Sequence, residues 1–314
     1  MTDSIIANYF VDENGFKFHD DSDEVISEAF TEFSKILVEA KKGGGETYHT
    51  ELVWGVCTSS GRRLTDLLYG PSGIDADARR LLYGLLHKCQ NRESPSLADG
   101  VLVGDGLAET ASTGAILCAL DLENQQPAAL LTTNQSSIRG IALIRISQTE
   151  AELQASYIAE VNDFKYFWRQ VPEICNLQPH AIETVAQQAF PESNFIEGVW
   201  SGAKEFEGEI ATIRGTLISH LSGLDDHFLS VYGETNDPNR IAAEMGSRAG
   251  IDCSKESNRT RRNSKAMSSR VRSIGSKDLS FEWHTKLEAH RNRIHFAVDD
   301  GKLYIGIFCR HLEI

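Results

Sequence analysis

Histidines and basic residues are concentrated in the last part of the chain, residues 281–314. This segment contains four of the ten histidines, interleaved with lysines and arginines. Imidazoles take up and release protons near neutral pH, and guanidinium and ammonium groups stabilise the negative charge that builds up on a phosphate. These residue types can therefore cleave or hold a phosphodiester. The candidates for such a catalytic site are His284, Lys286, Arg293, His295, Arg310 and His311.

A metal site is the other chemistry that histidines serve. Carboxylates are few around these histidines, and arginines are many. The six cysteines are scattered along the chain and lack the CxxC spacing of a zinc ribbon. The sequence therefore predicts no metal ion and no other cofactor.

Two short segments alternate between apolar and polar residues, which predicts β-strands with one buried face and one face in water. The polar face of the first segment, residues 281–288, carries His284 and Lys286. The polar face of the second segment carries Arg293 and His295. Pairing of the two strands would bring these four side chains together on one wet face.

A third strand is predicted after the turn from Asp299 to Gly301, because Asp-Gly is a strong hairpin signal. This strand is apolar on both faces up to Arg310 and His311, which predicts a central place in the sheet. Gly306 within it predicts a close backbone approach. A second interpretation stays open, in which the polar residues are only the exposed side of a half-buried antiparallel sheet.

A basic arm, residues 255–277, precedes these strands. It contains eight lysines and arginines and one acid, with hardly any apolar residue. Such a segment is too polar to form a core of its own, so we expect a mobile arm or a segment that becomes ordered on a phosphate-bearing partner. The candidate nucleic-acid-binding residues are Lys255, Arg259, Arg261, Arg262, Lys265, Arg270 and Arg272.

Charge is distributed unevenly along the chain. The net charge is −14, but residues 255–311 hold thirteen basic and six acidic residues, a net of +7, which leaves −20 on residues 1–254. The asymmetry suggests an anionic ligand at the C-terminal part or an attraction between the two parts of the chain. RNA or DNA, an acidic protein partner, and masking by the acidic N-terminal region are therefore the expected interactions.

The length and the pattern of elements predict an α+β protein. We expect an acidic, mixed or mostly helical N-terminal region over residues 1–95 and a mixed α/β middle region over residues 96–204. Residues 205–314 would then form a basic domain of helices packed on a small antiparallel sheet. Apolar runs are too short to span a membrane and the N-terminus is acidic, so a cytoplasmic protein without membrane contact is expected.

Several elements outside the C-terminal strands can also be predicted. Helical periodicity and capping residues indicate helices over residues 22–42, 74–91 and 206–233. Residues 48–57 are predicted as a strand, and residues 149–171 as a helical region rich in aromatic residues. The glycines after residue 103 lack the spacing of a phosphate-binding P-loop, which favours an ordinary turn before a short helix.

The C-terminal part also resembles a known fold. Two helices followed by three antiparallel strands, ending in the Arg- and His-bearing hairpin RIHFAVDDGKLYIGIFCRH, resemble the RelE/ParE-type toxins, which include metal-independent, ribosome-dependent messenger-RNA endonucleases. The resemblance covers residues 205–314 at most. It implies that Arg293 and Arg310 contact phosphate, and that Lys286, His295 and His311 act as acid or base.

The chain departs from these toxins in its long acidic N-terminal extension and in its WHTK strand, and the related fold also includes gyrase poisons without nuclease activity. The C-terminus is similar as well to a group of uncharacterised bacterial proteins that end in a WHxK, RIHF, IG and HL pattern.

Together these features predict a bacterial protein that engages nucleic acid. Its activity would be that of a metal-independent ribonuclease of toxin–antitoxin or phage-defence type. The alternative is a non-catalytic interaction or scaffold subunit whose basic C-terminal face binds an acidic protein partner.

Overall fold

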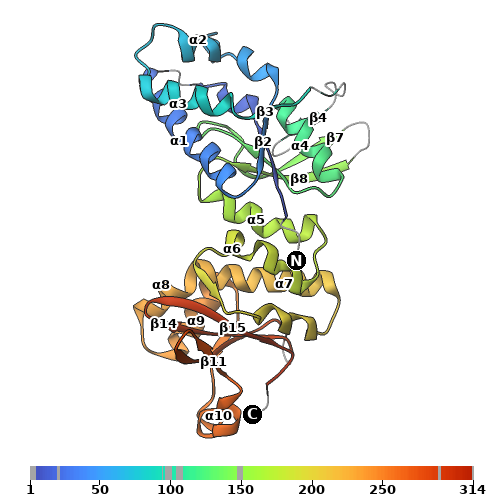
Figure 1. The fold of residues 1–314 in the computed structure, drawn as a ribbon, viewed down its shortest axis with the longest axis vertical. Helices are drawn as coiled ribbons and strands as arrows, with labels where there is room; N and C mark the ends of the chain where they lie inside the picture. The colour runs from blue at the N-terminus through green and yellow to red at the C-terminus, as the bar shows by residue number, and fades with distance from the viewer. Residues whose placement is uncertain are drawn as a thin grey trace. The chain divides into compact units, whose positions relative to one another are not determined.

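The computed structural model describes residues 5–19, 22–93, 95, 101–103, 109–146, 151–288 and 291–312. These residues form two compact units, and the boundary falls between Phe167 and Trp168, inside helix α5 (Asp163–Ile174). Helices and sheets occur together, so the predicted α+β fold class is confirmed (Figure 1). The three-part division predicted from the sequence has other boundaries, after residues 95 and 204, and stays a prediction.

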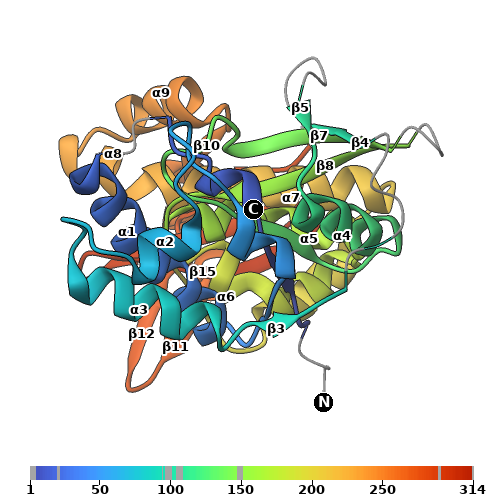
Figure 2. The ribbon, with the colours of Figure 1, turned by 90° about the horizontal axis from the view of Figure 1, so that it is seen from above.

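The N-terminal unit is built on an eight-stranded sheet with the order β3-β2-β1-β6-β8-β7-β4-β5. The first five strands in this order are parallel, and β7, β4 and β5 continue the sheet in antiparallel pairs, as Figure 2 shows for β8, β7 and β4. The strands are β1 (Asn8–Val11), β2 (Glu46–His49), β3 (Gln90–Asn91), β4 (Val101–Val103), β5 (Glu109–Thr110), β6 (Ala128–Leu131), β7 (Gly140–Ile146) and β8 (Ala151–Ile158).

Helices lie on both sides of this sheet, with α1 and α3 on one side and α4 on the other (Figure 1). They are α1 (Asp23–Lys42), α2 (Leu64–Tyr69), α3 (Ala76–Leu86) and α4 (Thr113–Glu123), with 3-10 turns η1 (Glu13–Phe16) and η2 (Glu51–Gly55). The predicted helix over residues 22–42 is confirmed. The helix predicted over residues 74–91 is present but ends at Leu86, and residues 90–91 form β3. Asp75 caps α3 by accepting hydrogen bonds from two backbone N–H groups of its first turn.

Two predictions in this unit were wrong. Residues 48–57 were predicted as one strand, but β2 ends at His49 and η2 follows. Residues 149–171 were predicted as helical, but residues 151–158 form β8, which pairs with β6 on one side and β7 on the other. Two neighbouring strands outweigh the helical propensity of a short segment. Helix α5 begins only at Asp163.

The N-terminus of α4 is occupied by a side chain of the protein itself. The Glu13 carboxylate accepts a hydrogen bond from the backbone N–H of Gly114 at 2.9 Å and one from the Thr50 hydroxyl at 2.5 Å. This end of the helix therefore already holds a negative charge, consistent with an ordinary helix start. The glycines that precede the helix, residues 104 and 106, lie outside the described residues.

The C-terminal unit contains a five-stranded sheet with the order β10-β13-β14-β15-β9. Four strands pair antiparallel in the order β10, β13, β14 and β15, while β9 runs parallel to β15. The strands are β9 (Ser193–Phe195), β10 (Cys253–Lys255), β13 (Trp283–Lys286), β14 (Arg293–Asp299) and β15 (Lys302–Cys309), and a separate hairpin is formed by β11 (Val271–Ile274) and β12 (Lys277–Ser280). The predicted antiparallel C-terminal sheet is confirmed.

The hairpin between β14 and β15 turns where the sequence predicted it. Asp300 and Gly301 have positive φ angles of 49° and 69°, as a tight two-residue turn requires. β15 lies inside the sheet, between β14 and β9, as its apolar pattern predicted. Gly306 does mark a close approach, but the neighbour is the ring of Phe281 and not a backbone.

Helices of the C-terminal unit surround this sheet. The predicted helix over residues 206–233 is present but interrupted by a π-helical turn, η6 (Leu224–Phe228), between α7 (Ile210–Gly223) and α8 (Leu229–Glu234). The remaining helical elements are η4 (Pro179–Val185), α6 (Ala186–Ala189), η5 (Val199–Glu205), α9 (Pro238–Ala249), α10 (Asn258–Arg262) and α11 (Ser264–Ser268). Within the described ranges, no helix has the length and apolar character that a membrane span needs.

Candidate functional site

Strand pairing brings four of the predicted site residues together. In the register of β13 and β14, His284 lies opposite His295, and Lys286 lies opposite Arg293. The rings of the two histidines are 5.2 Å apart and tilted by 32°. The neighbourhood that the alternation of the sequence predicted is therefore present.

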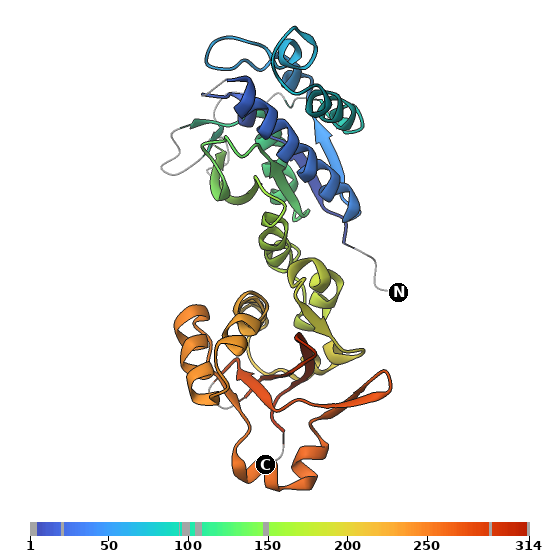
Figure 3. The ribbon, with the colours of Figure 1, turned by 90° about the vertical axis from the view of Figure 1, so that its left-hand side faces the viewer.

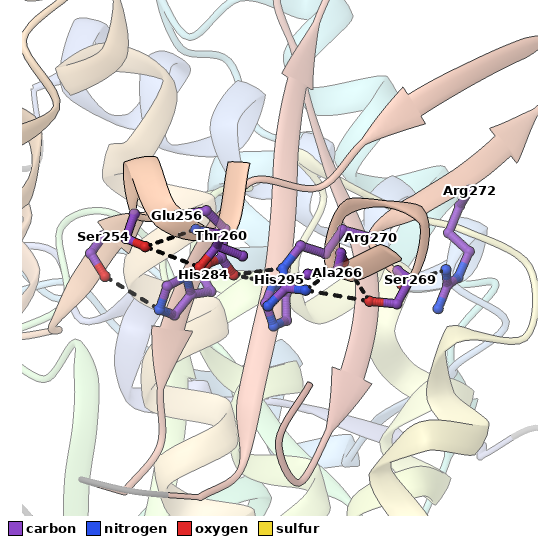
Figure 4. Close-up of polar contacts among 10 residues, drawn as sticks. Ser254, Glu256, Thr260, Ala266, Ser269, Arg270, Arg272, His284 and His295 are labelled. Atoms are coloured by element: carbon purple, nitrogen blue, oxygen red, sulfur yellow. Dashed lines mark hydrogen bonds and ion pairs between the residues drawn. The ribbon is translucent and has the colours of Figure 1, made fainter. Parts of the chain in front are cut away.

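The prediction that this face is wet was wrong. His295 is fully buried and His284 is only 7% exposed. The reason is that the segment after β10 crosses this face, with Glu256 and Arg270 buried directly against the two histidines (Figure 4). The sheet is thus covered on both faces at this point, and alternation within a strand carries no information about such a cover.

Arg270 fixes the covering segment in place. Its guanidinium is fully buried, and Nε donates to Oε1 of Glu256 at 2.7 Å. Nη1 donates to the carbonyl of Ala266 at 2.7 Å, and the carbonyl of Arg270 accepts from the backbone N–H of Phe281. The expectation of a mobile basic arm was therefore wrong, because one of its arginines is an internal anchor with a buried carboxylate partner.

The polar atoms of the cluster converge on the Glu256 carboxylate. Its Oε1 lies 3.7 Å from Nδ1 of His284 and 3.9 Å from Nδ1 of His295. Within the described part of the chain, neither Nδ1 atom has a hydrogen-bond partner. Nε2 of His284 lies 3.3 Å from the hydroxyl of Ser254 (Figure 4).

Both imidazoles are held in the neutral form. Burial lowers the pKa of His284 to about 4. The negative charge of Glu256 raises this pKa, and the positive charges of Arg293, Lys286 and Arg270 lower it further. Burial and the neighbouring His284 also lower the pKa of His295 well below its ordinary value. The nearby backbone of Phe281 raises the pKa of His295, but neither ring nitrogen of His295 forms a hydrogen bond with the described residues.

The other predicted catalytic residues lie at the edge of the cluster or outside it. Lys286 lies 3.6 Å from the Asp252 carboxylate. Arg293 is half-buried. Arg310 is exposed and forms an ion pair of 2.7 Å with Glu207, so its guanidinium is engaged away from the histidines.

His311 is exposed at the end of the sheet. Partial burial and the charge of Arg293 lower its pKa.

The predicted nucleic-acid-binding residues divide into two groups. Four of them are exposed, and we call these four the basic tip. They lie on α10 and α11, the two short helices beyond the sheet, which Figure 3 shows in orange. The basic tip consists of Arg259, Arg261, Arg262 and Lys265.

The other three serve the structure. Lys255 lies 3.4 Å from Glu282, Arg270 is the buried anchor, and Arg272 donates to the carbonyls of Ser269 and Val271.

Sequence reasoning missed Glu256, which is the centre of the cluster. The available signal was that Glu256 is the one acid among eight basic residues in residues 255–277. A single acid among many basic residues is expected to form an ion pair with one of them, and here its partner is Arg270, fourteen positions later.

No family model, curated protein or solved structure matches the chain. The resemblance of the C-terminal part to the RelE/ParE-type toxins therefore stays a prediction. The C-terminal unit has five strands in its main sheet, so any such likeness concerns β13, β14 and β15 and not the whole sheet.

Proposed function

We propose that the C-terminal unit binds the phosphate backbone of RNA or DNA through the basic tip. One observation carries the proposal: Arg259, Arg261, Arg262 and Lys265 are all exposed on α10 and α11, and buried Arg270 fastens these helices to the sheet. Within the described residues, Arg259 and Arg262 form no ion pair. Their guanidinium groups are available to bridge phosphate oxygens.

The ordered state of the tip favours this function. A mobile arm loses conformational entropy when it binds, whereas a segment that is already anchored loses less, so the same contacts give a higher affinity. Residues 1–254 carry a net charge of −20. A local cationic surface in an otherwise acidic chain attracts polyanions, which supports a nucleic-acid partner. Phosphate contacts of this kind bind nucleic acid without reading the base sequence.

Binding is better supported than metal-independent cleavage. For cleavage, His284 and His295 would have to reach a scissile phosphate, and a general base must lie within hydrogen-bonding distance of its proton. His295 is fully buried, and His284 nearly so. The proposal therefore places nucleic acid at the exposed tip and gives the histidines no contact with it.

The proposal can be tested by fluorescence anisotropy with labelled single-stranded RNA and duplex DNA. We expect binding at about 50 mM salt that weakens steeply as salt rises. The double variant Arg259→Ala/Arg262→Ala should bind more weakly, and its slope of log affinity against log salt on duplex DNA should fall by about 1 to 2.

The matched control is Lys204→Ala/Lys302→Ala, which removes two exposed cations elsewhere in the same unit. It should bind like the unaltered protein. Absence of binding to either nucleic acid at low salt, or equal losses in the two double variants, would overturn the proposal. In that case the tip is better explained as a docking surface for an acidic protein.

A further inference from the structure

We propose that Glu256, His284 and His295 bind a divalent transition-metal ion of the zinc or iron(II) class. One ligand atom from each residue lies within 4.8 Å of the other two, and all three residues are buried. They come from three separate parts of the C-terminal unit: the end of β10, β13 and β14. The inference does not rest on the proposed nucleic-acid binding, because the basic tip and this cluster share no residue.

The distances come close to those of a coordination site. Zinc bonds of about 2.1 Å to nitrogen and oxygen place tetrahedral ligand atoms about 3.4 Å from one another. Oε1 of Glu256 lies 3.7 Å and 3.9 Å from the two Nδ1 atoms. The two histidine ligand atoms lie within 4.8 Å of each other. Side-chain rotations must therefore bring the carboxylate oxygen closer to each Nδ1 by a few tenths of an ångström and the two imidazole donors closer together by up to about 1.4 Å.

A second observation, independent of the distances, is that nitrogen atoms of the two histidines are buried without a hydrogen bond. A buried polar atom without a partner is costly, and native proteins contain few of them. Here two such atoms, Nδ1 of His284 and Nδ1 of His295, face the same carboxylate. A shared metal ion satisfies both lone pairs at once.

The donor set selects the class of metal. Two neutral imidazoles and one carboxylate suit zinc, iron(II) and their first-row neighbours, whereas calcium and magnesium prefer oxygen ligands alone. Three protein ligands also leave a coordination position for a further group.

Neighbouring side chains orient two of the three ligands, whereas Nε2 of His295 has no hydrogen-bond partner among the described residues. Coordination through Nδ1 of His284 requires the proton on Nε2, and Nε2 lies within hydrogen-bonding distance of the Ser254 hydroxyl. Arg270 donates to Glu256 and fixes the carboxylate above the two rings (Figure 4). Partners of this kind are what ligating histidines and carboxylates ordinarily have.

The surrounding charge indicates what the remaining position holds. Arg270 offsets the charge of Glu256, and Arg293 and Lys286 act on the same histidines. A divalent ion added here would be left uncompensated, so the further ligand is a small anion such as hydroxide.

The test uses the 314-residue chain, stripped with a chelator and then titrated with Zn²⁺, and with Fe²⁺ under anaerobic conditions. We expect about one equivalent of metal bound per chain in competition with a chromophoric chelator. His284→Asn and His295→Asn should lose it. His220→Asn should keep it, because His220 is another buried histidine of the same unit that lies outside the cluster.

A measurement on the unaltered protein keeps the inference testable if the variants fail to fold. With Co²⁺ or Zn²⁺ bound, X-ray absorption should show nitrogen and oxygen ligands with imidazole scattering. No binding of any of these ions, binding unchanged in both histidine variants, or a sulfur shell from cysteine ligation would each overturn the site.

Discussion

A single buried histidine, His220, shows how side-chain contacts set protonation in this protein. The Thr285 hydroxyl has one proton and donates it to the carbonyl of Asp252 at 2.8 Å. Its oxygen therefore accepts a hydrogen bond of 2.6 Å from Nδ1 of His220. Burial lowers the pKa of His220 from 6.5 to about 4, and the Asp252 carboxylate opposes this only in part.

This arrangement predicts a specific loss of stability in acid. The unfolded chain takes up a proton at His220 near pH 6.5, but the folded protein does so only near pH 4. The contribution of His220 is thus complete above pH 6.5 and is lost as the pH falls towards 4, by about 3 kcal/mol. His220→Asn retains an N–H donor for Thr285 but does not titrate, so its free energy of unfolding should fall less over this range.

Urea unfolding at a series of pH values measures the difference between the two proteins. Other buried histidines contribute equally to both, so only the difference reports on His220. Parallel stability curves from pH 7 to pH 4 would contradict the assignment.

At the residue scale, the sequence could predict which side chains are neighbours but not which are buried. The period of two in a strand placed His284 beside Lys286 and put both opposite Arg293 and His295, and the register agrees. Burial depends on what lies over the strand. That cover is the contact between Glu256 and Arg270, and no local periodicity encodes it.

At the element scale, one glycine determines how β15 packs. A Cβ atom at Gly306 would overlap the ring of Phe281, which is fully buried and has no room to move aside. The strand can lie this close to Phe281 because residue 306 has no side chain.

We therefore expect Gly306→Ala to destabilise the protein by about 1–3 kcal/mol through overpacking. The additional substitution Phe281→Leu should recover part of this loss, because the smaller side chain makes room for the methyl group. A double-mutant cycle from denaturant unfolding gives the coupling between the two positions.

The control for this prediction is Gly215→Ala. Gly215 lies in α7 with open space around its Cα, so alanine there should be neutral or stabilising. Gly306→Ala that behaves like Gly215→Ala, or additivity in the cycle, would show that the ring of Phe281 does not limit this position.

Elements with strong local signals were predicted well, and elements that depend on partners were not. Helix α1 has acids in its first turn, Lys41 and Lys42 in its last, and a buried stripe between them, all of which are visible in the sequence. β8 alternates between apolar and polar residues from Ala151 to Tyr157, but most of these residues favour helices, and its strand character is settled only by pairing with β6 and β7. The two short helices of the basic tip owe their position to Arg270, which a count of charges in the sequence could not distinguish from its neighbours.

At the scale of a whole unit, a buried ion-pair network joins elements of the C-terminal unit that are distant in sequence. Arg169 on α5 donates to Asp225 at 2.9 Å, to Asp226 at 2.7 Å and to the carbonyl of Ala189 at 2.8 Å. Asp225, in the π-helical turn, also accepts from the backbone N–H of Glu192 and the hydroxyl of Ser193, at the start of β9. The sequence gives no indication of these contacts, which join residues between 20 and 57 positions apart.

Arg169→Met should consequently lower the stability of the C-terminal unit strongly, by about 3–5 kcal/mol, because it leaves Asp225 buried without its cation. The comparison is Arg248→Met, which removes a surface cation that is paired with Glu234 and Glu244 and should change the stability little. Hydrogen exchange should show faster exchange across α5, β9 and the π-helical turn in the first variant only. Equal and small effects would mean that burial adds nothing to this pair. If burial determines the loss of stability, removal of Arg270 should be similarly destabilising, because its ion pair with Glu256 is equally buried and holds the basic tip on the sheet.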